Sequence, residues 1–109
     1  MLEAIVLAHL RYLENVERFM EGGPEPALTP PTECSLGRWL AGEGRGAYGH
    51  LPAFQEVVSL HERFHGLTAE AVSLKQEGKE AEARERMNEA YRLFGRIEHL
   101  LLRLDEERL

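Results

Sequence analysis

Residues 80–105 carry the sequence EAEARERMNEAYRLFGRIEHLLLRLD, in which apolar positions recur at alternating steps of four and three residues. These positions are Ala83, Met87, Ala90, Phe94, Ile97, Leu101 and Leu104. A heptad-like spacing places an apolar seam along one face of a long helix, and other helices must cover that seam. This stretch therefore predicts a helical bundle.

Two other stretches repeat the helical period, and in both of them histidines share the apolar face. One helix is expected over residues 2–20, ended by the Gly-Gly-Pro run at 22–24, with the face Leu2, Ile5, His9, Leu13, Val16 and Met20. Another is expected from Pro52 to a turn at Gly78, with the face Phe54, Val57, Val58, His61, Phe64, His65, Thr68 and Val72. The bundle thus has three long helices.

A shorter helix is expected over residues 33–40, with Thr32 as its N-cap. The glycine-rich stretch that follows, up to Gly49, is expected to be a long turn pinned by aromatic residues such as Trp39, which most simply belongs to the core. Ala, Glu, Lys, Leu and Arg supply about half of the chain, which is typical of long helices. The sequence predicts one all-α domain over residues 1–109.

Three long helices leave one side of a four-helix arrangement open, so either the short helix or a second copy of the chain must cover it. Leu93, Leu100 and Leu102 add apolar surface beside the seam of the last helix. Since a large exposed apolar patch is unusual in a monomer, we expect a homodimer.

Charge and hydropathy exclude several classes of protein. The net charge of −6 argues against a nucleic-acid binder. No apolar run is long enough to span a membrane, and Glu3 stands where a signal peptide would carry positive charge. We therefore expect a cytoplasmic protein. Cys34 is the single cysteine, so it is a buried thiol, a metal ligand or a redox-reactive group.

Three of the five histidines, together with Cys34, predict a zinc site. His61 and His65 are four residues apart, so both imidazoles can reach one ion, and His9 has the same kind of inward position on the first helix. Cys34 is expected in the first turn of the short helix, where the helix N-terminus would lower the thiol pKa. One such histidine is usually a core residue, but imidazole and thiolate together favour Zn²⁺.

Residues 61–65, His-Glu-Arg-Phe-His, also match the HExxH motif of zinc peptidases, in which Glu62 would be the general base. Glu82, Glu85 or Glu89 could supply a third ligand. No strand precedes the motif to form a substrate cleft, and a site that uses His9 and Cys34 leaves no position for water. We therefore expect a non-enzymatic protein with Glu62 on the surface, and we assign no function to the two remaining histidines, His50 and His99.

Residues 34–40, Cys-Ser-Leu-Gly-Arg-Trp-Leu, resemble the signature of the chemoreceptor zinc-binding (CZB) domain family: Cys, any residue, Leu or Phe, Gly, any residue, Trp. The resemblance continues through residues 42–44 (GEG), residues 48–52 (YGHLP) and Phe54, then the His61 and His65 pair and the small residues Ala69 and Ala71. A histidine in the first helix, as His9 is here, belongs to the pattern too.

This resemblance implies a helical bundle that often dimerises, with a zinc site made of His9, Cys34, His61 and His65. It also implies control of an output domain in bacterial signalling, either a chemoreceptor or a diguanylate cyclase. No such output domain follows in this sequence, so we expect a partner protein supplied in trans. The favoured hypothesis is a sensor in which zinc occupancy or Cys34 oxidation shifts helix packing. The alternatives are a purely structural zinc domain and, less favoured, a zinc hydrolase.

Overall fold

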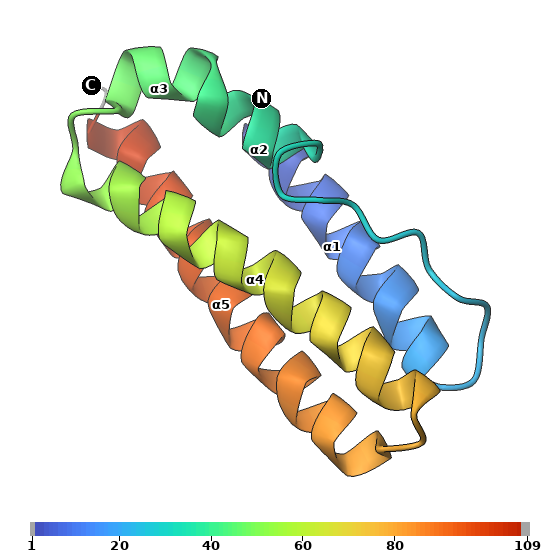
Figure 1. Cartoon of the computed structure of the whole chain (residues 1–109). Helices are drawn as coiled ribbons and strands as arrows, with labels where there is room; N and C mark the ends of the chain where they lie inside the picture. Colours follow the sequence, from blue (N-terminus) through green and yellow to red (C-terminus); the bar gives the residue numbers. More distant parts are fainter. Residues whose placement is uncertain (1, 108–109) are drawn as a thin grey trace.

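The computed structural model describes residues 2–107, and over that range the chain is helical with no strand (Figure 1). Its helices are α1 (Leu2–Met20), α2 (Ser35–Ala41), α3 (Glu43–Tyr48), α4 (Pro52–Gln76) and α5 (Glu80–Glu107). The prediction of an all-α chain with three long helices is confirmed. Among the described residues, no helix has both the length and the apolar character needed to cross a membrane.

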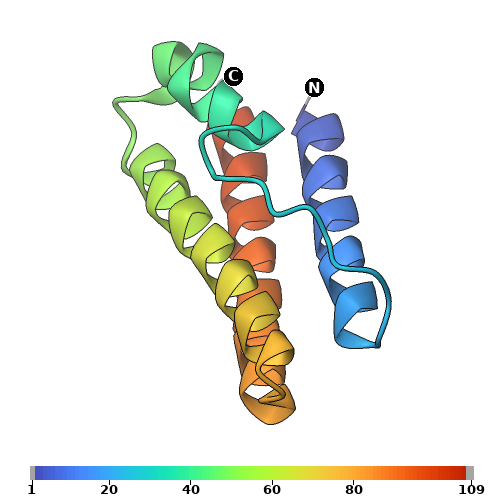
Figure 2. The same cartoon turned by 45° about the vertical axis from the view of Figure 1, so that its right-hand side comes forward.

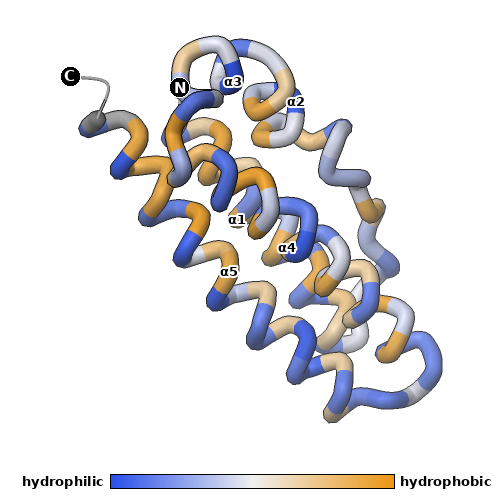
Figure 3. Tube along the Cα trace, turned by 60° about the vertical axis from the view of Figure 1, so that its left-hand side comes forward, coloured by the Kyte–Doolittle hydropathy of each residue, from blue (hydrophilic) through white to orange (hydrophobic). Residues whose placement is uncertain are grey.

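The antiparallel hairpin of α4 and α5 is the most extensively packed part of the fold (Figure 1). Gly78 adopts a φ of +80°, and the amides of Gly78 and Lys79 donate to the carbonyls of Lys75 (3.0 Å) and Leu74 (2.9 Å). This glycine-based cap ends α4 and starts the turn, as the sequence predicts. The seam of α5 is buried except at Phe94, which is partly buried. Hydrophobic and hydrophilic positions alternate along α5 in Figure 3.

Helix α1 runs parallel to α4, which is possible because a long connection returns the chain to the starting end of α1 (Figures 1 and 2). Gly22, with a φ of +98°, ends α1 where the sequence predicts. The chain then passes back alongside α1 and reaches α2. Ile5, His9, Leu13 and Val16 form the buried face of α1. The return of the loop brings residue 34 close to His9.

The sequence predicts a long turn over the glycine-rich stretch up to Gly49, and this prediction is wrong, because Glu43–Tyr48 form the helix α3. The ring of Trp39 lies 5.8 Å from the ring of Tyr48 and 6.2 Å from that of Phe54, centroid to centroid. A Cβ placed on Gly44 would lie only 2.6 Å from the Trp39 ring, so the missing side chain lets α3 pack on Trp39. Tertiary packing thus stabilises a helix that two glycines disfavour in isolation.

The apolar surface of α5 is also smaller than expected. Leu100 is only 2% exposed and belongs to the core of its own chain. Leu93 is partly buried, whereas Leu102 is 57% exposed. The short helices α2 and α3 lie at one end and do not cover the open side along its length (Figure 1).

Candidate metal centre

Four side chains, from α1, from α4 and from the residue directly before α2, meet near the middle of the bundle. His9 comes from α1, Cys34 precedes α2, and His61 and His65 come from α4; one potential ligand atom from each lies within 4.8 Å of all the others. The histidines are buried, with His61 only 2% exposed, and Cys34 is half-buried. The structure therefore brings together all four residues that the sequence predicts as a site.

The distances between the potential ligand atoms suit one tetrahedral ion. His61 Nε2 lies 3.3 Å from His9 Nε2 and 3.1 Å from His65 Nε2. Cys34 Sγ lies 3.0 Å from His61 Nε2 and 3.5 Å from His9 Nε2. Zn–N and Zn–S bonds of ordinary length would separate two nitrogens by about 3.3 Å and a nitrogen and a sulfur by about 3.6 Å.

A bound cation explains this cluster better than hydrogen bonds among the four side chains do. His9 Nδ1 donates to the carbonyl of Ile5 at 3.1 Å, so the Nε2 atom of a neutral His9 carries a lone pair. His61 Nε2 faces three potential partners with at most one proton to share. A metal ion at the centre satisfies every lone pair at once, which favours a metal-binding role.

The environment keeps the imidazoles in the neutral form that binds metal. Burial, with smaller contributions from the neighbouring His65 and His9, lowers the pKa of His61 to about 3. Burial and the charge of His9 lower the pKa of His65 to about 4, against an opposing effect of the Thr29 backbone. Burial likewise lowers the pKa of His9. Because these pKa values are lowered, protons do not compete with a metal ion for the imidazole nitrogens near neutral pH.

Cys34 differs from the sequence prediction in two respects. It is itself the N-cap of α2, in place of Thr32, because its Sγ accepts a hydrogen bond from the Gly37 amide at 3.3 Å. The pKa of the thiol is raised by burial, which outweighs the lowering by the Gly37 and Leu36 amides. The helix N-terminus therefore does not by itself produce a thiolate, and a bound cation would have to displace the proton.

Gly37 allows α2 to sit against the cluster. A Cβ at this position would lie 1.7 Å from the Pro31 carbonyl oxygen and 3.4 Å from His61 Cε1. The missing side chain of Gly37 thus permits this close approach. Trp39 packs against Tyr48 of α3 and Phe54 of α4, so it is a core residue, as the sequence predicts.

Two residues that support the site were not identified from the sequence. Tyr12 Oη and Thr68 Oγ1 are 2.9 Å apart, and Thr68 Oγ1 donates to the carbonyl of His65 at 3.1 Å. The Tyr12 ring centroid lies 5.3 Å from that of His65. This contact ties α1 to α4 beside the cluster. Tyr12 follows His9 by three residues, and Thr68 follows His65 by three, so both share the ligand face of their helices, which was the available signal.

His65 Nδ1 is the buried side-chain nitrogen that makes no well-formed hydrogen bond with a described residue. The Thr29 backbone is nevertheless close enough to influence the pKa of His65. Metal-bound imidazoles usually donate their second N–H to a carbonyl or a carboxylate. The Thr29 backbone is thus the neighbouring group that could accept this hydrogen bond from His65.

The remaining candidates lie outside the cluster. Glu62 is exposed, as predicted, and Glu89 pairs with Arg63 at 2.5 Å. Neither Glu82 nor Glu85 joins the four-residue group in the described part of the chain. His50 and His99 are both exposed and lie away from the group. Four protein ligands would fill a tetrahedral shell and leave no position for the water that a zinc hydrolase needs.

Comparison with known proteins adds an independent finding. No curated protein and no solved structure matches the chain. The family model described as the chemoreceptor zinc-binding domain matches residues 9–72, which is more than half of the chain and spans all four residues of the cluster. The donor set of three imidazoles and one thiol suits Zn²⁺, the ion for which this family is named. The chain belongs to the chemoreceptor zinc-binding (CZB) domain family.

Proposed function

We propose that this chain is a cytoplasmic regulatory domain of bacterial signalling that holds one zinc ion through His9, Cys34, His61 and His65. The observation that carries the proposal is the convergence of four donor atoms, from α1, from α4 and from the N-cap of α2, at spacings that fit a tetrahedral ion. Residues 1–109 would form a single domain of this kind. Its output would reach a partner protein in trans.

The proposed switch is the link between α2 and the rest of the bundle. His9, His61 and His65 lie on long helices, whereas Cys34 caps a helix of seven residues between a proline-rich loop and a glycine-rich corner. Loss of zinc, or oxidation of Cys34 by a hypochlorite-type oxidant, would release α2 without bending a long helix. The freed helix would change the surface offered to the partner.

Elemental analysis of the purified protein tests the metal site. We expect about one zinc ion per chain. His61→Ala and His65→Ala should weaken zinc binding at least about tenfold, while His50→Ala and His99→Ala should leave it unchanged. Protein that carries no metal when fresh and takes none up on titration would rule out the proposal. Equal effects of all four substitutions would show that the ligand set is wrong.

Oxidant titration tests the switch. Zinc-loaded protein should release zinc to a chromogenic indicator in parallel with the oxidation of Cys34, followed by mass spectrometry. If zinc leaves while Cys34 stays reduced, or Cys34 is oxidised without any change in zinc affinity, the sensor role fails. The purely structural zinc domain would then be the better account.

We also propose a two-fold dimer. An apolar groove between α1 and α5 is lined by Leu2, Val6, Leu7, Leu10, Leu101 and Leu102. Leu7 is 46% exposed and Leu102 is 57% exposed. A second copy would bury this surface. Light scattering that reports a monomer at micromolar concentration and above would refute the dimer.

A further inference from the structure

The proposed zinc site is flanked by two pockets that differ in the number of ligands they reach. One pocket, here called the α1–α2 pocket, has a volume of about 250 Å³ and is lined by residues that include His9, Cys34 and His65. The other, the α2–α4 pocket, has a volume of about 130 Å³ and includes only His61 of the four. A solute in the first pocket therefore meets three ligands, and a solute in the second meets one.

Cys34 makes the α1–α2 pocket the easier side from which to load the site. It is half-buried, whereas the three histidines are at most 5% exposed. It also sits where a long loop meets a short helix, the least anchored of the four positions. An ion that arrives from this side can bind Cys34 first and then reach the histidines without moving a long helix.

Glu33 places a carboxylate on the wall of the same pocket. It is exposed and directly precedes Cys34 in the chain. A carboxylate near the mouth raises the local concentration of a divalent cation, and this attraction is screened by salt. Glu62 has the corresponding place on the wall of the α2–α4 pocket. The two carboxylates therefore offer a matched comparison between the two sides.

We propose that zinc enters and leaves through the α1–α2 pocket and that Glu33 steers the ion toward Cys34. This inference rests on the proposed zinc site and adds a direction of exchange to it. Small chelators would remove the ion from the same side. A regulatory site must exchange its metal on a useful timescale, and an open side at the half-buried ligand Cys34 provides that exchange.

Stopped-flow kinetics with one variant on each pocket wall tests the route. Ala8 lines the α1–α2 pocket and Ala41 lines the α2–α4 pocket, and both are exposed helical residues that a leucine should not unfold. Zinc uptake by metal-free protein and zinc release to a chelator are measured for each. Ala8→Leu should slow both rates at least about fivefold with affinity within about twofold, since it obstructs the path and not the ligands. Ala41→Leu should match the wild type.

The same assay tests the steering role. Glu33→Gln should slow uptake about three- to tenfold at low ionic strength, and the difference should vanish in 0.5 M sodium perchlorate because salt screens the attraction. Glu62→Gln is the control and should leave uptake unchanged. If Glu33→Gln weakens equilibrium affinity more than about tenfold with unchanged uptake, Glu33 is a ligand and the steering role is wrong.

Failure of the route and failure of the site give different results. Slower exchange in Ala41→Leu but not in Ala8→Leu would assign the route to the other pocket. Wild-type rates in all variants, with one zinc bound per chain, would overturn the route and leave the site intact. Absence of any zinc binding by the wild-type protein in equilibrium competition would overturn the proposed function itself.

Discussion

Gly37 shows how one missing side chain controls the approach of α2 to the cluster. Its amide donates to Cys34 Sγ, and its Cα faces the Pro31 carbonyl so closely that no Cβ fits. Both contacts hold Cys34 next to the histidines. A backbone carbonyl is a rigid neighbour, so a larger residue must push α2 away.

Gly37→Ala should therefore weaken zinc binding at least about tenfold and destabilise the metal-free protein by about 1–3 kcal/mol. Gly46→Ala is the matched control: Gly46 also lies in a short helix, but a Cβ there would meet nothing within 4 Å. Affinity is measured by competition with a zinc indicator and stability by urea unfolding. Similar behaviour of the two variants would show that the close approach at Gly37 has no consequence.

The buried histidines predict how the metal-free protein responds to acid. Their pKa values lie below the ordinary 6.5 in the folded chain, at about 3 for His61 and about 4 for His65. In the unfolded chain they take up protons below pH 6.5, which the folded chain resists, so stability falls as the pH drops from about 6.5 toward 4. At pH 5, each such histidine should lower the free energy of unfolding by about 2 kcal/mol.

Urea unfolding in the presence of a chelator, at pH 7 and pH 5, measures this loss. His61→Phe should reduce the loss, because the variant has no imidazole to protonate in the unfolded chain. His99→Phe is the control, since His99 is exposed, and it should lose as much stability as the wild type. An acid response that is the same in all three proteins would contradict the burial of neutral imidazoles.

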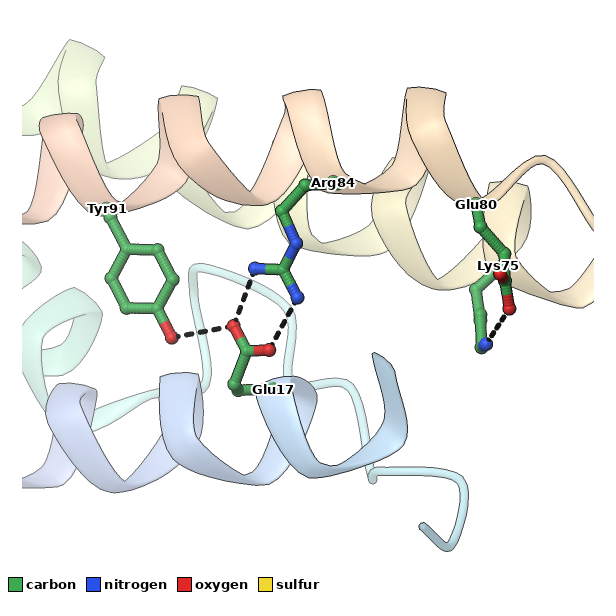
Figure 4. A network of polar contacts seen from close by, with 5 residues as sticks. All are labelled: Glu17, Lys75, Glu80, Arg84 and Tyr91. Atoms are coloured by element: carbon green, nitrogen blue, oxygen red, sulfur yellow. Dashed lines mark hydrogen bonds and ion pairs between the residues drawn. The ribbon is translucent and has the colours of Figure 1, made fainter. Parts of the chain in front are cut away.

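Helix α1 is joined to α5 by a polar clamp on the half of α1 that follows His9. The Glu17 carboxylate accepts hydrogen bonds from both terminal nitrogens of Arg84, at 2.9 and 2.6 Å, and from the Tyr91 hydroxyl at 3.0 Å (Figure 4). Lys75 and Glu80 form a separate exposed pair at the α4–α5 turn. The clamp and the metal site thus hold α1 at two places along its length.

Glu17→Gln should destabilise the protein by about 1–2 kcal/mol, because the bidentate pair is lost from a carboxylate whose side chain is only 22% exposed. Glu70→Gln removes one exposed contact with Arg86 and should cost under about 0.5 kcal/mol. Thermal unfolding of both variants provides the comparison. Equal losses would mean that the clamp is no stronger than an ordinary surface ion pair.

The long helices could be predicted because each one carries its own signal. The stripe from Leu2 to Met20 and the glycine at 78 are local features, and the structure keeps both. Helix α3 could not be predicted, because its two glycines disfavour a helix and the packing of Gly44 against Trp39 is not visible in the local sequence. The cap at Cys34 was missed since Thr32, two residues earlier, is the better cap by residue type alone.

The site, too, has features that the local sequence predicts and features that depend on tertiary packing. Three histidines on the apolar faces of two helices, together with the single cysteine, were enough to predict the cluster of His9, Cys34, His61 and His65. The supporting contact between Tyr12 and Thr68 depends on how α1 is rotated against α4, and no local pattern encodes that rotation. The pKa of Cys34 depends on the balance between burial and amide hydrogen bonds, which only the packed structure reveals.

The whole molecule is a rod of 47 × 19 × 18 Å whose core extends well beyond the metal site. The buried residues include Val16, Val72 and Met87 at one end and Leu36 and Leu104 at the other. Because this apolar core does not depend on zinc, we expect the metal-free protein to remain folded. Zinc should adjust the position of α2 in a bundle that already exists.

Far-ultraviolet circular dichroism before and after chelation tests that expectation. The helical signal should fall by no more than the contribution of α2 and its neighbour α3, since α1, α4 and α5 keep their packing. A zinc-finger-like loss of most of the helical signal on chelation would contradict it. The His61→Ala variant, assayed without chelator, serves as a control for effects of the reagent.

X-ray absorption spectroscopy at the zinc edge of the loaded protein tests the central claim most directly. A site made of His9, Cys34, His61 and His65 predicts three nitrogens at about 2.0 Å and one sulfur at about 2.3 Å, with no bound water. Cys34→Ser should remove the sulfur shell alone. A wild-type spectrum without sulfur, or with a water or carboxylate oxygen in place of a histidine, would contradict the proposed site.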